Sequence, residues 1–179
     1  GLGDVYKRQS VLFWSLGNES YAGDILVEMN RYYKEKDPDR LVHYEGVAEN
    51  RPYEDLISDM ESQMYAPPEK IKEYLENNPK KPFILCEYMH DMGNSLGGME
   101  SYIRLLDQYE DYQGGFIWDY IDQALFVKDE VTGRDVLRYG GDFDDRPSDY
   151  EFSGNGILFA DRTEKPAMQE VRHYYGLRR

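Results

Sequence analysis

Short apolar runs alternate along the chain with longer segments in which apolar residues recur every three or four positions. The short runs are bounded by glycine, proline or polar residues, which predicts buried strands. They lie at Val11–Trp14, Leu41–Tyr44, Phe83–Cys86 and Gly115–Trp118, with a weaker candidate at Asp59–Tyr65. The longer segments predict helices with one apolar face. These lie at Ala22–Lys36, where Ile25, Met29 and Tyr33 are spaced for one face, and at Pro68–Asn78, Leu96–Tyr109 and Lys165–Tyr175.

This order of elements predicts an α/β fold with a parallel sheet, because its nearly continuous apolar strands are suited to burial on both faces. A polar, glycine-rich excursion fills residues 125–156, and residues 1–9 do not fit the pattern. We treat residues 1–9 as an unmatched leader of cloning or assembly origin. A complete (β/α)8 barrel takes about 250 residues. The 179 residues hold roughly half the strands of such a barrel, so the chain is a compact α/β domain or a piece of something larger.

Charge and cysteine content narrow the classes of partner. With 21 Lys and Arg against 35 Asp and Glu, the net charge is −14, which disfavours nucleic acid and anionic membrane surfaces as partners. The apolar runs are too short for a transmembrane helix. Cys86 is the one cysteine, which excludes a disulfide within the chain and a cysteine-built zinc site. A reducing, cytoplasmic location is the expectation.

Polar residues gather where the predicted strands end. The first strand runs into Gly17–Ser20, the third apolar run into Glu87–His90, and the last into Asp119. In parallel βα folds these strand ends form the active face, so Glu19 and Glu87 are expected near one another. Two carboxylates across a pocket, one protonated and one ionised, are the minimum apparatus for glycoside cleavage. Spacing alone leaves open the alternative that each glutamate is a cap or an ion-pair partner.

Five motifs then carry a resemblance to a known family. They occur in the order FWSLGNES (13–20), ILCEYMHDMGNSLGG (84–98), QGGFIWDYIDQAL (113–125), YGGDFDD (139–145) and NGILFADR (155–162). Together they resemble glycoside hydrolase family 2. Ser20 after the first glutamate, where family members such as the β-glucuronidases usually carry proline, favours the β-galactosidase branch. So does HDMGNS after the second glutamate.

The resemblance implies a fold and an activity for residues 10–179. The fold is the C-terminal half of a (β/α)8 TIM barrel, from its fourth strand to its last helix. The missing N-terminal part of the same enzyme is then a partner, and the parent is a homo-oligomer. The activity is retaining hydrolysis of terminal non-reducing β-D-galactosides of the lactose type. The alternatives are a truncated, non-catalytic fragment, a galactose-binding module and another family 2 β-glycosidase.

The resemblance also assigns roles to individual residues. Glu19 is the general acid/base and Glu87 the nucleophile, a pair that lies about 5–5.5 Å apart in retaining enzymes. Asn18 matches an asparagine that binds the sugar 2-hydroxyl, and Tyr65 matches a tyrosine that orients the nucleophile.

Two further residues of the resemblance are sugar contacts. His90 matches a sugar-binding histidine, and Trp118 matches the tryptophan that forms an apolar wall for the galactose ring. Their structural alternatives are a backbone-bonded histidine and plain core packing.

Metal sites follow from the resemblance only in part. The acid/base Glu19 shares Mg²⁺ with a glutamate and a histidine some 40 residues upstream in the family, and neither is present here. Phe152, through its backbone carbonyl, and Asn155, through its side-chain oxygen, match the family Na⁺ site. Oxygen donors of this kind suit a hard cation. A further aspartate ligand of that site also lies upstream in the family.

Overall fold

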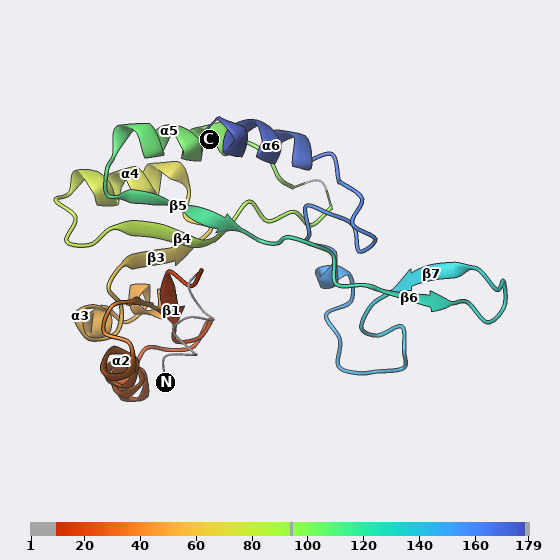
Figure 1. Ribbon diagram of the computed structural model, residues 1–179, viewed down its shortest axis with the longest axis horizontal. Coiled ribbons are helices and arrows are strands. Elements are labelled where there is room, and N and C mark those ends of the chain that lie inside the picture. Colours follow the sequence, from red (N-terminus) through yellow and green to blue (C-terminus); the bar gives the residue numbers. More distant parts are fainter. Residues whose placement is uncertain (1–9, 94, 178–179) are drawn as a thin grey trace. The chain divides into compact units, whose positions relative to one another are not determined.

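The computed structural model describes residues 10–93 and 95–177, so the predicted leader lies outside the described residues (Figure 1). The chain divides into two compact units, each of which is described by itself. The N-terminal unit holds residues 10–86 and 109–114, and the C-terminal unit holds residues 87–108 and 115–177.

The N-terminal unit is built from strands that neighbour one another in chain order. Its short β1 pairs in parallel with β2, and β3, β4 and β5 form a three-stranded sheet in that order. The arrows of these three strands point the same way in Figure 1. Such sequential order is typical of a βα barrel, whereas doubly wound sheets reverse their order. The elements are β1 (Phe13–Ser15), α2 (Asp24–Lys36), β2 (Leu41–His43), α3 (Glu54–Ile57), β3 (Glu61–Met64), α4 (Pro68–Glu76), and β4 (Phe83–Tyr88) and β5 (Tyr112–Ile117), which both continue into the C-terminal unit.

Helix α2 packs on the core of this unit through part of the face that the sequence predicts. Val27 is buried, and Met29 and Tyr33 pack against the core, but Ile25 is 75% exposed. The prediction for Ile25 was wrong because a spacing of four residues drifts by about 40° per step around a helix. The core cluster consists of Leu16, Ala22, Val27, Val42, Tyr44, Val47 and Ile57.

His43 connects the two sheets of the N-terminal unit. Its Nδ1 lies 2.9 Å from the hydroxyl oxygen of Ser15 on β1, and its Nε2 lies 2.6 Å from that of Ser62 on β3. The residue is 5% exposed, and burial lowers the pKa of its imidazole from 6.5 to about 4. His43 therefore joins β1, β2 and β3 in its neutral form.

This histidine predicts a pH-dependent stability. Between pH 6.5 and 4 the unfolded chain binds the His43 proton and the folded chain does not, so the contribution is complete above pH 6.5 and declines as pH falls toward 4. At pH 5 the loss is about 2 kcal/mol relative to neutral pH. We expect His43→Gln to reduce the difference in unfolding free energy between pH 7.5 and pH 5 by that amount. Urea unfolding of both proteins at both pH values measures it, and equal differences would contradict the assignment.

The C-terminal unit packs two helices against a polar-rich loop region. Helices α5 (Met99–Gln108) and α6 (Met168–Gly176) lie against each other. The Met99 backbone N–H donates to the Glu170 carboxylate at 2.8 Å, so a side chain of α6 satisfies a free donor of the first turn of α5. Its core cluster consists of Met99, Ile157, Leu158 and Val171.

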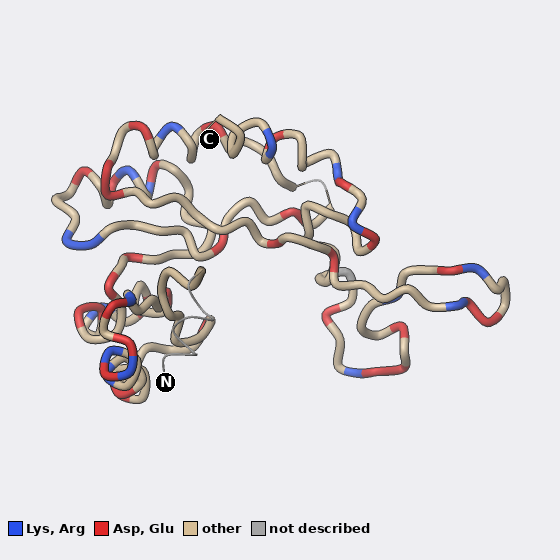
Figure 2. The backbone as a smooth tube through the Cα atoms, viewed as in Figure 1, with Lys and Arg blue, Asp and Glu red and all other residues tan. Residues whose placement is uncertain are grey.

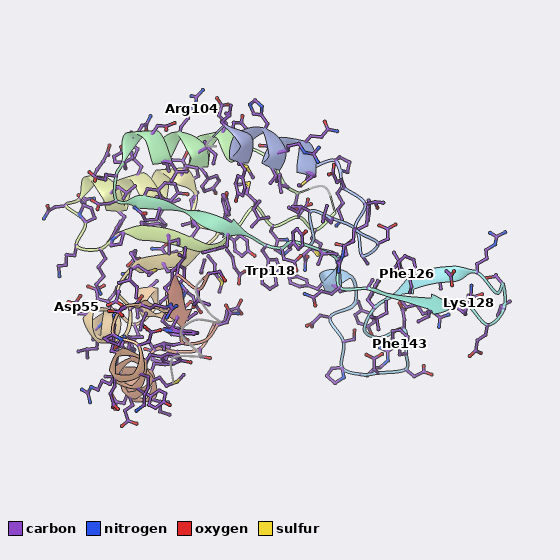
Figure 3. All side chains as sticks on the ribbon, in the orientation of Figure 1. Asp55, Arg104, Trp118, Phe126, Lys128 and Phe143 are labelled. Atoms are coloured by element: carbon purple, nitrogen blue, oxygen red, sulfur yellow. The ribbon has the colours of Figure 1, made fainter. Side chains whose placement is uncertain are left out.

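The segment 125–156 contains a hairpin that the sequence analysis missed. Strands β6 (Leu125–Lys128) and β7 (Asp135–Arg138) pair antiparallel, and Lys128 faces Asp135 across the pair with an ion pair of 2.8 Å. The Asp129 carboxylate accepts hydrogen bonds from Thr132, and Gly133 has a φ of +68°. An aspartate, a threonine and a left-handed glycine in this order are hairpin-loop chemistry, which the polar composition concealed. Figure 3 shows Phe126 and Lys128 on β6.

Charged residues of both signs are interspersed along both units, as Figure 2 shows. Among the described residues, the helices all fall short of the length and apolar character that crossing a membrane requires.

Candidate active site

Glu19 sits on a tight turn that follows β1. Its backbone has a φ of +53°, in the left-handed region that non-glycine residues seldom adopt. The Glu19 N–H donates to the Glu45 carboxylate at 2.5 Å, and the Ser20 N–H donates to the Tyr44 hydroxyl at 3.0 Å. The side chains of Asn18 and Glu19 are both exposed. The turn thus places the predicted acid/base at a strand end, and hydrogen bonds to Glu45 and Tyr44 hold its backbone.

Tyr65 directly follows β3 and also has a left-handed backbone. Its φ is +52°, and its side chain is 40% exposed. In the C-terminal unit, Met89 follows β4 with a φ of +55°. Strained backbone of this kind clusters at functional sites, where the surrounding structure holds it in place. Three strand ends that carry predicted site residues therefore share one uncommon conformation.

A cavity of about 520 Å³ lies beside Glu19 within the N-terminal unit. Its lining residues follow the C-terminal ends of β1, β2 and β3 or lie near them, which is the face where βα barrels build their sites. The lining includes Glu19, Ser20, Glu45, Glu49, Met64 and Lys70.

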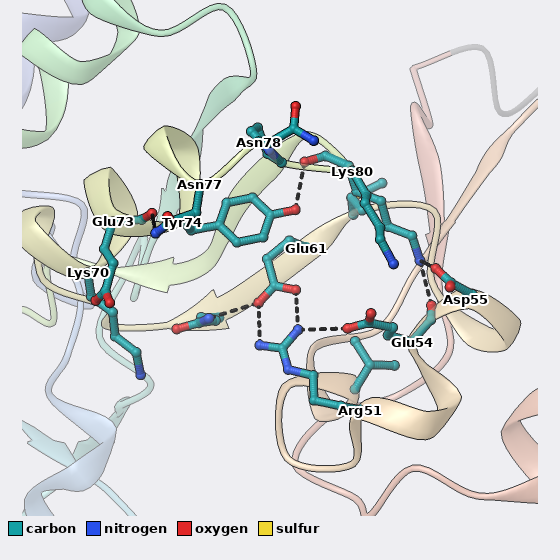
Figure 4. A pocket seen from close by; sticks show the side chains of 15 residues that line it. Arg51, Glu54, Asp55, Glu61, Lys70, Glu73, Tyr74, Asn77, Asn78 and Lys80 are labelled. Carbon is teal, nitrogen blue, oxygen red and sulfur yellow. Dashed lines mark hydrogen bonds and ion pairs between the residues drawn. The ribbon is translucent and has the colours of Figure 1, made fainter.

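A second cavity of this unit, of about 440 Å³, is shown in Figure 4. Arg51 forms two hydrogen bonds with the buried Glu61 carboxylate, at 2.6 and 2.9 Å, and an ion pair with Glu54 at 3.1 Å. The Tyr74 hydroxyl donates to the Lys81 carbonyl at 2.9 Å. Arg51, Glu54 and Glu61 bind one another, so we assign this charged cluster a structural role.

The remaining predicted residues belong to the C-terminal unit. There the segments that follow β4 and β5 continue to form backbone hydrogen bonds with each other. Glu87 and His90 are half-buried at and after the end of β4. Trp118, which Figure 3 labels just past β5, donates its backbone N–H to the Tyr88 carbonyl at 3.0 Å. The Asp91 N–H donates to the Trp118 carbonyl, also at 3.0 Å. These bonds hold the segments that carry Glu87, His90 and Trp118 next to each other.

A third segment of the C-terminal unit, residues 152–157, binds to the chain directly after Trp118. The Asp119 N–H donates to the Asn155 carbonyl at 2.8 Å, and the Ile157 N–H donates to the Asp119 carbonyl at 3.1 Å. The rings of His90 and Phe152 lie 5.5 Å apart. Phe152 and Asn155 therefore join the segments of Glu87, His90 and Trp118 within this unit.

Sequence reasoning gave no role to two groups that the structure makes conspicuous. Within the described part of the chain, the buried oxygens Oδ2 of Asp91 and Oδ1 of Asp119 have no hydrogen-bond partner. Burial raises the pKa of both carboxyl groups. Glu45 was also missed, although it directly follows an apolar run, as Glu87 does. The position of Glu45 directly after a predicted strand was the sequence signal that could have identified it.

The two metal sites differ in how well the residues fit. The Asn155 amide nitrogen donates to the Phe152 carbonyl oxygen, and Asn155 Oδ1 is buried without a partner among the described residues. An unpartnered amide oxygen close to a carbonyl fits two ligands of a hard cation such as Na⁺. For Mg²⁺ the fit fails, because the described residues contain no group of three or more His, Cys, Asp or Glu that could hold a metal ion.

Comparison with known proteins identifies the family. The model for "Glycosyl hydrolases family 2, TIM barrel domain" matches residues 6–178. The chain is 74% identical over 174 residues to the "Beta-galactosidase large subunit" of Latilactobacillus sakei, which covers 97% of this chain and 28% of that protein. It is 61% identical over 169 residues to the "Beta-galactosidase" of Halalkalibacterium halodurans, covering 94% of this chain and 16% of that protein. The chain thus spans about a quarter of the Latilactobacillus sakei relative.

Solved structures agree on the fold. The Lactobacillus rhamnosus β-glucuronidase matches 97% of this chain and 33% of its own, with a TM-score of 0.59 and 17% identity. The β-D-glucuronidase for Dictyoglomus thermophilum matches 96% of this chain and 33% of its own, with a TM-score of 0.57 and 16% identity. The strand order, the family match and these neighbours confirm the predicted TIM-barrel class, and the chain belongs to the TIM barrel domain of glycosyl hydrolase family 2.

Proposed function

We propose that the protein hydrolyses terminal β-D-galactosides with retention of anomeric configuration. The observation that carries this proposal is the pair of glutamates at strand ends, Glu19 after β1 and Glu87 in β4, within a chain of this family. The names of relatives that are 61–74% identical support galactose as the sugar.

The mechanism uses the two carboxyl groups in turn. In the first step a Glu87 oxygen bonds to the anomeric carbon, and the bond to the leaving oxygen breaks as Glu19 donates a proton to it. In the second step Glu19 removes a proton from water, which attacks the anomeric carbon and releases Glu87. The first step leaves Glu19 ionised, which is the form in which it acts as a base. The second step restores the proton of Glu19 and frees the carboxylate of Glu87.

The remaining site residues position the sugar in this proposal. Asn18 binds the 2-hydroxyl, where a hydrogen bond strengthens in the transition state. Tyr65 orients the Glu87 carboxylate, His90 binds a sugar hydroxyl, and Trp118 offers an apolar face to the ring.

The proposal includes one cation, Na⁺. The Phe152 carbonyl and Asn155 Oδ1 would hold Na⁺, which supplies a fixed positive charge for sugar oxygens. Because the described residues hold no group that fits Mg²⁺, the proposed mechanism contains no step through that ion.

The names of several relatives also bear on assembly. A protein named a large subunit implies a second kind of subunit in that protein, so we propose a partner chain beside the homo-oligomer predicted from the sequence.

Trapping the covalent intermediate tests the function. A 2-deoxy-2-fluoro-β-galactoside with a good leaving group forms the glycosyl-enzyme, and the fluorine slows its hydrolysis. We expect peptide mass spectrometry of the active protein to find the label on Glu87, and the matching glucuronide to leave the protein unlabelled. A label on another residue, or on the glucuronide-treated protein alone, would overturn the assignment.

A further inference from the structure

The turn that carries Glu19 rests on three consecutive residues that follow β2, Tyr44, Glu45 and Gly46, which we call the cradle. The Glu45 carboxylate accepts the Glu19 N–H at 2.5 Å, although the two residues are 26 positions apart. The Tyr44 hydroxyl accepts the Ser20 N–H at 3.0 Å and donates to the Ser20 carbonyl. Three backbone groups of the turn are therefore bound by two side chains of the cradle.

Gly46 completes the cradle by leaving space. A Cβ added to Gly46 would lie 2.6 Å from the Ser20 carbonyl oxygen and 2.7 Å from the Tyr44 ring. Both distances are shorter than side-chain carbons tolerate, so a larger residue would push the turn away. The Ser20 backbone can approach the cradle only because this position is glycine.

The cradle residues are placed as a rigid support. Tyr44 is completely buried in the core cluster, and Glu45 is only 7% exposed. The Tyr44 N–H also donates to the Ser58 hydroxyl at 3.1 Å, which fixes its backbone. A buried carboxylate is costly unless it is hydrogen-bonded, and the Glu19 N–H supplies such a bond.

We propose that Glu45, with Tyr44 and Gly46, is a positioning group for the acid/base Glu19. Glu19 has an exposed side chain and a left-handed φ of +53°, so the direction of its carboxyl group depends on its backbone. The hydrogen bond from Glu19 N–H to Glu45 holds that backbone in a conformation that non-glycine residues adopt only when the surrounding structure supports it. This inference rests on the proposed role of Glu19 and adds the residues that aim it.

Leaving-group dependence separates aiming from plain stability. A misplaced acid/base slows proton transfer to a poor leaving group, and a displacement of about 1 Å can cost about 100-fold. An activated leaving group departs without a proton, so kcat/KM for it is insensitive to the aim of Glu19. A purely structural defect lowers both values alike, because it reduces the amount of active enzyme.

The test compares Glu45→Leu with two controls in the active enzyme. Glu45→Gln keeps an acceptor oxygen for the Glu19 N–H, and Glu28→Leu removes an exposed carboxylate of α2 that does not line the cavity. We expect Glu45→Leu to lower kcat/KM for lactose about 100-fold and that for 2,4-dinitrophenyl β-galactoside less than about 3-fold. We expect Glu45→Gln to recover most of the lactose activity and Glu28→Leu to behave as wild type.

A second variant, Tyr44→Phe, keeps the proposal testable if Glu45→Leu does not fold. Tyr44→Phe removes the hydroxyl that binds Ser20 and keeps the buried ring, and we expect a smaller loss with the same leaving-group dependence. Equal losses for both substrates in Glu45→Leu and Tyr44→Phe, or no loss in either, would overturn the proposal. Glu19→Gln is assayed alongside: if it shows the leaving-group dependence and Glu45→Leu does not, the positioning role alone is wrong.

Discussion

Glu87→Gln is expected to abolish turnover, with kcat lower by about 10⁵-fold for every galactoside, whatever its leaving group. An amide oxygen is too weak a nucleophile to attack the anomeric carbon. Glutamine matches the volume of glutamate, and the backbone bond that Trp118 donates to Tyr88 does not involve the Glu87 side chain, so the strand end should be preserved. Steady-state assays with lactose and 2,4-dinitrophenyl β-galactoside measure the loss.

The matched control for this variant is Glu100→Gln on α5. Glu100 is an exposed glutamate of the same unit that pairs with Arg104 at 2.5 Å. The Glu100→Gln variant makes the same chemical change away from the strand ends. We expect its activity to be within about 2-fold of wild type, because exposed ion pairs contribute little to stability. If Glu87→Gln kept more than a hundredth of wild-type turnover while its Tm was unchanged, Glu87 would not be the nucleophile.

The second large effect is expected for Glu19→Gln, and it depends on the substrate. For lactose, whose leaving group needs a proton, kcat/KM should fall by about 10²–10⁴-fold. For 2,4-dinitrophenyl β-galactoside it should change little, because the first step needs no acid. The second step still lacks its base, so the glycosyl-enzyme accumulates and both kcat and KM fall.

Azide gives this prediction a distinctive readout. Azide attacks the glycosyl-enzyme without base assistance, so it should raise kcat of Glu19→Gln and form galactosyl azide of retained configuration. Glu28→Gln, an exposed glutamate of α2 in the same unit, is the control and should not respond. Equal losses for the two substrates, with no azide effect, would remove Glu19 from the acid/base role.

Local sequence pattern was sufficient for most elements and for the placement of the two glutamates. The run Phe83–Cys86 became the first part of β4, and Pro68 begins α4, as a proline does in a first helical turn. These features depend on side chains close together in the chain. The hairpin β6–β7 was missed because residues 125–156 are polar and rich in glycine overall, and the short apolar run Leu125–Val127 is mostly exposed instead of marking a buried strand.

Local sequence pattern could not predict the contacts within the site, because they join residues that are far apart in sequence. The motifs pointed to Phe152 and Asn155, but the docking of their segment on Asp119 came from backbone bonds some 36 residues apart, between residues 119 and 155. Burial of the Asp91 and Asp119 carboxyl groups, which raises the pKa of each, also follows from how the loops pack.

The sequence by itself determined the alternation of strands and helices, the family and the position of each glutamate at a strand end. Only the tertiary structure decided what holds Glu19. Its N–H meets the Glu45 carboxylate across 26 residues, and Gly46 leaves the space that the turn needs. The physical reason is that periodicity reports which face of an element is buried, whereas hydrogen bonds between elements depend on how those faces pack.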